Sequence, residues 1–274
     1  DFNTQRLGPA PAALADDLRQ LDALVGRLAD MARDDGARVV VLSEYSLSSV
    51  SRPVALNRAL REAGLVEVRE VAGREHLDIG ASAAFAMVDH QVAHVYVRPA
   101  TWSRVAVATA AVRERLLAVE GVAEVLDAAA QAGRGIAHPR SGDLVCVAEP
   151  DAWFSYYWWL DDDAAPDFAR TVDIHAKPGY DPAELFVDRA TRSIPLDASL
   201  VRGSHGRTGP DDPTGVLLVD DPPCGYPDGE SVRAEEAHRD HVRSELAGAR
   251  SSARLLATLP VLVLAVSAGT GLAP

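Results

Sequence analysis

Apolar residues recur at spacings of three and four between residues 11 and 35, and this pattern predicts a long amphipathic helix. Charged residues fall off the apolar stripe, as they do on a helix that buries only one face. Gly36 follows directly and is a suitable C-cap. The stripe consists of Leu14, Leu18, Leu21, Val25 and Leu28.

The next segment, residues 37–42, is apolar without alternation, which is typical of a strand buried on both faces of a parallel sheet. A helix followed by such a strand indicates an α/β protein with a mainly parallel central sheet flanked by helices. We expect residues 39–42 to form a central strand that packs against the leucines of the preceding helix. Ligands bind at the carboxyl ends of strands in such folds, so Glu44 and Tyr45 lie where a site is expected.

Shorter apolar runs predict the remaining elements. Two short helices are expected at residues 53–63 and 109–117. Strands are expected at 65–69, 84–88, 92–97, 122–126 and 144–148, with a turn at Asp89-His90-Gln91. From Asp161 onward Asp, Pro and Gly dominate, and a long irregular stretch of this kind tends to be functional or disordered.

Composition narrows the class of protein. Hydrophobic residues make up 47% of the 274 residues and charged residues 24%, which excludes a disordered or collagen-like chain. The net charge of −13 argues against a nucleic-acid coat, although a metal ion can still recruit a phosphoester or nucleotide. The two cysteines, Cys146 and Cys224, form neither a disulfide framework nor a cysteine zinc site. Lys177 is the only lysine, which hints at a specific role.

Four polar clusters stand out, and each also has a plain structural interpretation. Asp89-His90 with His94 is read first as a hairpin turn with a cross-strand histidine, and residues 161–163 as a solvated acidic turn. Residues 173–181 gather Asp173, His175 and Lys177 in one loop, and residues 203–206 place His205 between two glycines. Zn²⁺ or Mn²⁺ accepts such a mixture of carboxylates and imidazoles, yet spacing alone gives a weak signal.

Taken together, five segments resemble the alkaline phosphatase superfamily, and within it the type I phosphodiesterase/nucleotide pyrophosphatase family. They cover roughly residues 1–210, the C-terminal part of a catalytic domain, and leave 211–274 as an acidic linker with a helical and apolar tail. The resemblance implies a sheet between helices, a two-metal site that usually holds zinc, and a threonine or serine nucleophile that forms a covalent intermediate. The segments are residues 1–9, 39–45, 88–94, 173–181 and 200–206.

Carried over by this resemblance, Asp1 and His205 match metal ligands, and Glu44-Tyr45 takes the place of an Asp-His pair. Gln5 stands where the family has a histidine, and neutral Tyr45 is a poor zinc ligand. His175 is the preferred substitute ligand and His90 the second choice. We expect Asp1, Glu44 and His205 to converge on one cleft, joined by His175 if it compensates, with Lys177 and Tyr45 near the substrate.

The resemblance implies metal-assisted hydrolysis of phosphodiester or nucleotide pyrophosphate bonds, with zinc or manganese as the cofactor. The nucleophile is expected upstream of Asp1, so the chain alone should be inactive. The alternative is a non-catalytic relative that serves as a binding or scaffold domain, because Gln5 and Tyr45 replace ligands.

The two ends of the chain carry the remaining expectations. No signal-peptide pattern follows Asp1, so we expect a cytoplasmic protein whose true N-terminus lies elsewhere. A helix is expected at 230–249. The apolar run at 255–266 is read first as a buried or partner-facing segment and second as a membrane anchor, with a non-native C-terminus as the third possibility.

Overall fold

The computed structural model describes residues 2–43, 45–99, 107–171, 187–188, 190–209, 211–213, 215–219 and 261–265. The chain divides into two compact units. The first unit consists of Asp1–Ala13 and Leu47–Asp212, and the second of Leu14–Ser46 and Pro213–Pro274.

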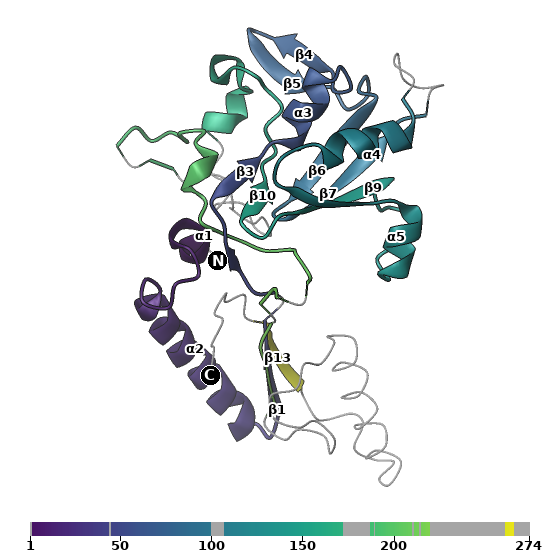
Figure 1. The fold of residues 1–274 in the computed structure, drawn as a ribbon. Helices are drawn as coiled ribbons and strands as arrows, with labels where there is room; N and C mark the ends of the chain where they lie inside the picture. The colour runs from purple at the N-terminus through teal and green to yellow at the C-terminus, as the bar shows by residue number, and fades with distance from the viewer. Residues whose placement is uncertain are drawn as a thin grey trace. The chain divides into compact units, whose positions relative to one another are not determined.

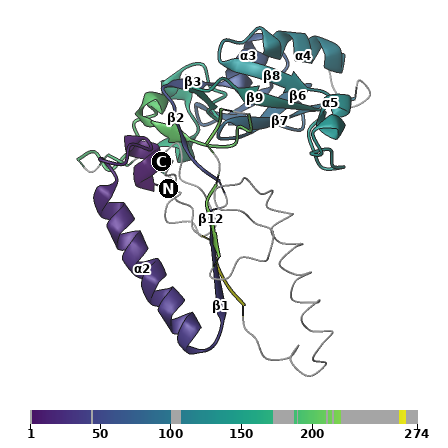
Figure 2. The same ribbon diagram turned by 60° about the horizontal axis from the view of Figure 1, so that its bottom comes forward.

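The first unit is built on a four-stranded sheet in the order β6-β7-β9-β8, and every neighbouring pair is antiparallel. All four strands lie where the sequence predicts them. Helices α3 and α4 cover one face of this sheet (Figures 1 and 2), with the fully buried Leu60 and Leu116 in the core between them and the strands. The bounds are Ala84–Asp89 (β6), Val92–Val97 (β7), Val122–Leu126 (β8), Leu144–Ala148 (β9), Leu56–Glu62 (α3) and Thr109–Leu117 (α4).

The outer edge of β6 is closed by a side chain of α3. Asn57 is 2% exposed, and its amide donates to the Ala86 carbonyl at 2.9 Å and accepts from the Ala86 N–H at 2.8 Å. The carboxamide therefore completes the backbone hydrogen bonds that an edge strand otherwise lacks. A further short helix, α5 (Ala128–Gly133), begins at Asp127, whose side chain accepts from the Ala130 N–H.

Three two-stranded sheets complete the first unit. β3 (Arg52–Val54) pairs in parallel with β10 (Ala152–Phe154), and β2 (Ser48–Ser49) pairs antiparallel with β11 (Gly203–Ser204). The strand expected at 65–69 is displaced to β4 (Val68–Val71), which forms a hairpin with β5 (Arg74–Leu77). The turn residues Ala72 and Gly73 both have positive φ, at 51° and 76°, and this tight turn fixes the register of the hairpin.

An aromatic cluster packs beside this hairpin. Trp159 is fully buried, and the Arg58 guanidinium lies 5.8 Å from its ring centroid. The Nε1–H group of Trp159 donates a hydrogen bond to Asp162 Oδ1 at 2.8 Å. The acidic turn at residues 161–163 therefore helps to hold this tryptophan in place. The hydrophobic members are Tyr157, Trp158, Trp159, Ala165, Ala169, Ile194 and Leu196. The short 3-10 helices are Asp162–Ala164 (η1), Asp167–Arg170 (η2) and Ala198–Leu200 (η4).

In the second unit, the helix α2 (Ala15–Asp34) leads into β1 (Arg38–Leu42), as the sequence predicts. β1 lies between β12 (Leu217–Val219), which is antiparallel to it, and β13 (Val261–Ala265), which is parallel. The packing of α2 differs from expectation. Its C-terminal turns contact Val39 of β1 through the buried Ala29 and Ala32.

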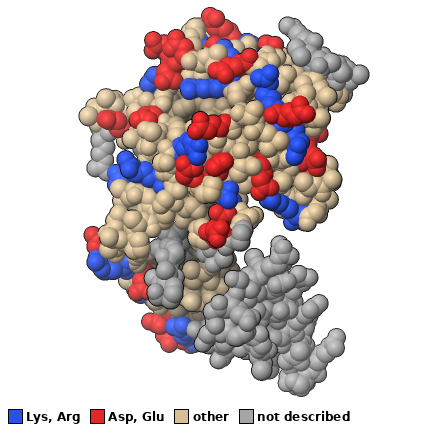
Figure 3. Space-filling view, in the orientation of Figure 1, with Lys and Arg blue, Asp and Glu red and all other residues tan. Residues whose placement is uncertain are grey.

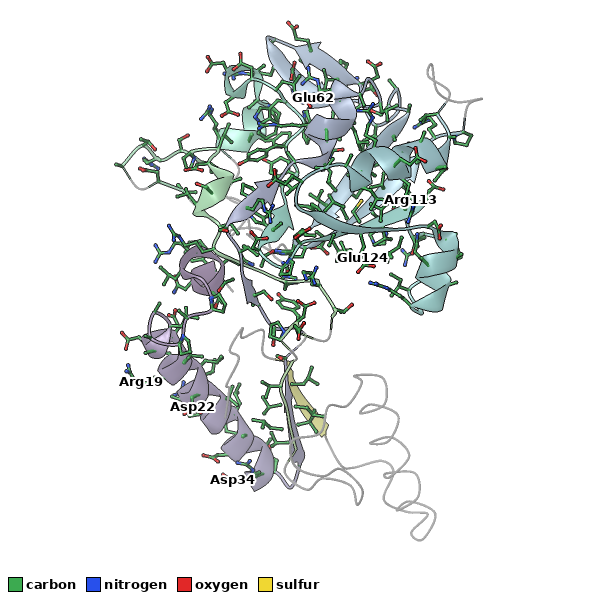
Figure 4. All side chains as sticks on the ribbon, viewed as in Figure 1. Arg19, Asp22, Asp34, Glu62, Arg113 and Glu124 are labelled. Atoms are coloured by element: carbon green, nitrogen blue, oxygen red, sulfur yellow. The ribbon has the colours of Figure 1, made fainter. Side chains whose placement is uncertain are left out.

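Of the leucines expected to make this contact, Leu14 is buried, whereas Leu18, Leu21 and Leu28 are half-buried. The small alanine side chains lie just before the connection to β1, where Gly36 adopts φ of +76° and brings the helix end close to the strand. The charged residues Arg19, Asp22 and Asp34 along α2 are exposed (Figure 4).

The prediction of a mainly parallel central sheet is wrong. Among the described strands, only β1–β13 and β3–β10 pair in parallel, and the sheets are small. The reason is that an unbroken apolar run indicates a strand buried on both faces but does not indicate whether it pairs parallel or antiparallel. Strand β9 is an example, because it is antiparallel to its neighbours and all five of its residues are buried. The fold class is therefore mixed α/β.

Part of the C-terminal apolar run is a sheet strand, because β13 pairs with β1. No helix in the described part of the chain is long and apolar enough to cross a membrane. The helix expected at 230–249 lies outside the described residues.

Candidate functional site

The tip of the β6–β7 hairpin carries the first residue of the site. His90 occupies the two-residue turn between Asp89 and Val92, as the sequence predicts, with φ of +56° and only 6% exposure. Its carbonyl accepts from the Phe154 N–H at 2.6 Å. The fully buried Gln91 donates through its side chain to the Ala152 carbonyl at 3.0 Å. The tip is therefore fixed to β10.

His205 follows β11 and meets this tip. Its carbonyl accepts from the Gln91 N–H at 2.8 Å, and its ring lies 3.8 Å from the His90 ring between centroids, at 34° between planes. The hydroxyl of Ser204 shares a hydrogen bond of 3.3 Å with His90 Nδ1. Gly206 has φ of +112° and lies so near the hairpin that a Cβ there would approach Val92 Cγ2 to 3.2 Å. Two histidines from separate sequence clusters thus form one contact pair.

The N-terminal helix α1 (Phe2–Leu7) packs against β11. The Arg202 N–H donates to the Gln5 carbonyl at 2.6 Å. Gly203 lies so close to α1 that an added Cβ would stand 2.4 Å from the Thr4 carbonyl oxygen. Gln5, where the family has a histidine, is completely buried at this contact. The segment that opens with Asp1 and the segment that ends in His205 are therefore neighbours.

The loop after His205 is held in place by Arg207. Its guanidinium donates to the Ala148 carbonyl at the end of β9, and its Nε donates to Asp212 Oδ1 at 3.1 Å. Both side chains of this ion pair are largely buried, at 16% and 11% exposure. Arg207 therefore anchors the loop.

A second ion pair braces the loop beneath the hairpin tip. Arg52 donates to Asp151 Oδ1 at 2.6 Å, and this hydrogen bond holds the pKa of the Asp151 carboxyl below its usual range. Burial raises the pKa of the Cys146 thiol, in the middle of β9, to about 12. Acidic and basic side chains are interspersed over the visible face of this unit (Figure 3), so the face shown offers no extended basic surface.

The structure tests the expected site residues only in part. Asp1, Glu44, His175 and Lys177 lie outside the described residues. Tyr45 is half-buried in the second unit and His205 half-buried in the first, so the convergence of the ligands stays a prediction.

Sequence reasoning missed Ser204 and placed His90 second to His175. A histidine in a two-residue turn, where Gly, Asn or Asp is usual, is the signal that could have drawn attention to it.

The described residues supply only part of the set of ligands that a metal ion needs. A neutral imidazole is a good zinc ligand, and the half-buried His205 can supply one. Asp89 Oδ1 lies 4.0 Å from His90 Nε2, and the Asp89 side chain is 80% exposed. Within the described ranges no group of three or more His, Cys, Asp or Glu side chains is arranged to hold a metal. His205 therefore needs partners from other parts of the chain.

The family model of type I phosphodiesterases/nucleotide pyrophosphatases matches residues 1–181, and the chain belongs to this family. The predicted family is confirmed. The matched range includes Gln5 and His90, and His205 lies beyond it.

Two solved structures of phosphonoacetate hydrolase from Sinorhizobium meliloti 1021 are similar to the chain. The complex with phosphonoacetate is 17% identical with a TM-score of 0.44, and covers 76% of this chain and 42% of that one. The complex with phosphonoformate is 16% identical with a TM-score of 0.48, and covers 89% and 49%. The chain thus spans less than half the length of these structures. No curated protein matches it.

Proposed function

We propose that this chain takes part in metal-dependent hydrolysis of phosphodiester or nucleotide pyrophosphate bonds. Membership of the family supports the reaction class. The observation that carries the proposal is the meeting of three motif segments in the first unit: α1 with Gln5, the hairpin tip with His90, and the loop with His205. Binding and catalytic residues are commonly found on loops that a rigid scaffold positions.

In this proposal His205 is a metal ligand, and Asp1, Glu44 and His175 supply the others. Zinc suits this donor set best, and manganese is the second choice. The bound ion would supply positive charge to polarise the phosphoryl oxygens. Lys177 and Tyr45 would contact the substrate. The part of the chain that the structure describes does the positioning: β11 carries His205, and Arg207 anchors the loop behind it.

Zinc binding tests the proposal directly. The chain of 274 residues is titrated with Zn²⁺ by isothermal calorimetry after chelation, alongside His205→Ala and His138→Ala. His138 is exposed, so the His138→Ala variant controls for zinc binding by histidines on the surface. We expect His205→Ala to weaken zinc binding about 10- to 100-fold or more, the scale seen for residues that support metal sites, and His138→Ala to leave it unchanged. Equal affinity in all three proteins would contradict the proposal.

Hydrolysis is a separate readout. The family places its nucleophile ahead of the segment that opens with Asp1, so we expect this chain to bind metal without turning over bis(4-nitrophenyl) phosphate. Phosphonoacetate is included as a second substrate, because a structure similar to this chain is a phosphonoacetate hydrolase. Metal-dependent turnover by the 274 residues alone would show that the catalytic group has been misplaced.

The second candidate is a non-catalytic relative that acts as a binding or scaffold domain. Gln5 favours it, because this buried residue replaces the family histidine with a carboxamide, a weaker zinc ligand. Zinc titration separates the two candidates, because a non-catalytic scaffold domain is expected to show no zinc binding that depends on His205.

A further inference from the structure

The ring of His90 lies against the ring of His205, and we infer that His90 is a positioning residue for His205. The inference rests on the proposed function, in which His205 is a metal ligand. In metal sites, the groups that orient a ligating histidine matter nearly as much as the ligand itself, because they fix the direction of its lone pair. The described part of the chain offers such an orienting group at the hairpin tip.

The tip contacts His205 twice, once through the backbone and once through a side chain. The Gln91 N–H donates to the His205 carbonyl at 2.8 Å, which fixes the main chain of His205. The centroid of the His90 ring lies 3.8 Å from that of the His205 ring, and this contact restricts rotation of the His205 ring. Gln91 is itself held by the hydrogen bond from its side chain to the Ala152 carbonyl of β10.

His90 itself is held on several sides. Its side chain is 3% exposed, its Nδ1 shares a hydrogen bond with the fully buried Ser204, and its carbonyl accepts from Phe154. Ser204, which orients His90 through this hydrogen bond, directly precedes His205. Both residues therefore lie at the end of β11. The ring contact and the hydrogen bond to Ser204 therefore link His90 to the strand end that carries His205.

The backbone at His90 points to a role for the side chain. Its φ of +56° lies in the left-handed region, which glycine adopts without cost and which other residues adopt rarely. A histidine kept in such a conformation, buried against a second histidine, is the kind of outlier from which a functional role can be inferred.

The geometry favours positioning over a shared metal. Two imidazoles that bind one tetrahedral zinc ion through bonds near 2.0–2.1 Å have ring centroids about 5 Å apart. The observed separation is 3.8 Å, and the rings are tilted by 34°, so they lie closer together than two ligands arranged around a common zinc ion. His90 thus supports His205 and does not replace the histidine missing at Gln5.

Two variants separate these roles. His90→Gly removes the ring at a position where glycine is unstrained, so the fold should be kept. His90→Phe retains a flat ring over His205 and removes both ring nitrogens. His138→Ala again serves as the control. The fold of each variant is checked by circular dichroism and thermal unfolding.

The first readout needs no metal. In the metal-free chain, the ring protons of His205 are observed by NMR, where the adjacent His90 ring shifts them by its ring current. We expect His90→Gly to abolish this shift and to broaden or average the His205 signals, and His90→Phe to keep a ring-current shift. Unchanged His205 signals in a folded His90→Gly protein would overturn the inference.

The second readout is zinc affinity. We expect His90→Gly to weaken zinc binding about 10- to 100-fold and His90→Phe to stay near the parent value, because the stacking surface is kept. If His90→Phe weakens binding as much as His90→Gly, a ring over His205 is not sufficient to support zinc binding, which overturns the inference. Zinc affinity unchanged in His90→Gly, with binding that still depends on His205, also overturns it. If instead the parent chain binds no zinc through His205, the proposed function fails, while the NMR result still decides whether His90 orients His205.

Discussion

Replacing Gly203 by alanine tests the contact on which the candidate site depends. The added Cβ would stand 2.4 Å from the Thr4 carbonyl oxygen, 3.1 Å from the Thr4 carbonyl carbon and 3.3 Å from Gln5 Cα. All three atoms are backbone, so no side chain can rotate away. Since comfortable non-bonded contacts begin near 3.5 Å, α1 and β11 must separate by about 1 Å.

The cost follows from two terms. Forcing extra volume into a packed contact costs about 1–3 kcal/mol. The separation also breaks the hydrogen bond of 2.6 Å from the Arg202 N–H to the Gln5 carbonyl, worth about 0.5–1.5 kcal/mol. We expect Gly203→Ala to lower the free energy of unfolding by about 2–4 kcal/mol, or the thermal midpoint by roughly 5–15 °C.

The assay is thermal and urea unfolding, with amide hydrogen exchange of Arg202 as a local probe. Gly133→Ala is the matched control, because Gly133 lies in α5 with nothing within 4 Å of the added Cβ. There the same substitution should stabilise by about 0.5–1 kcal/mol. If Gly203→Ala unfolds like the parent chain and the Arg202 amide keeps its protection, then α1 does not pack on β11 as described. The contact between α1 and the strand end that carries His205 would then lose its support.

Two further predictions concern the first unit. Asn57→Ala removes both hydrogen bonds to Ala86 at a site that is 2% exposed. It should lower the free energy of unfolding, measured in urea, by about 2–4 kcal/mol. A loss below about 1 kcal/mol would show that water replaces the amide. Cys146, whose pKa is raised to about 12 by burial, should not react with a disulfide reagent at pH 8 in native Cys224→Ser protein and should react once urea is added. Rapid modification of the native protein would contradict the burial of β9.

Several elements could be predicted from local pattern alone. The helix at 109–117 and the strands at 122–126 and 144–148 occur with the predicted bounds, and the turn at His90 lies between its two predicted strands. These elements follow from which positions are apolar, because a helix or strand with one buried face repeats that face along the sequence. The family could also be predicted, since short motifs in a fixed order carry it.

Local pattern and motif order are thus enough to place most elements of the first unit and to indicate the class of chemistry to look for. The direction of the strands, the pairing of β1 with the distant β13 and the contact between the rings of His90 and His205 become known only from the folded chain. The physical reason is that periodicity records whether a residue is buried and not what buries it. Contacts between distant segments depend on how every intervening element packs, and at His205 that packing includes Gly203, Gly206 and the strained hairpin tip.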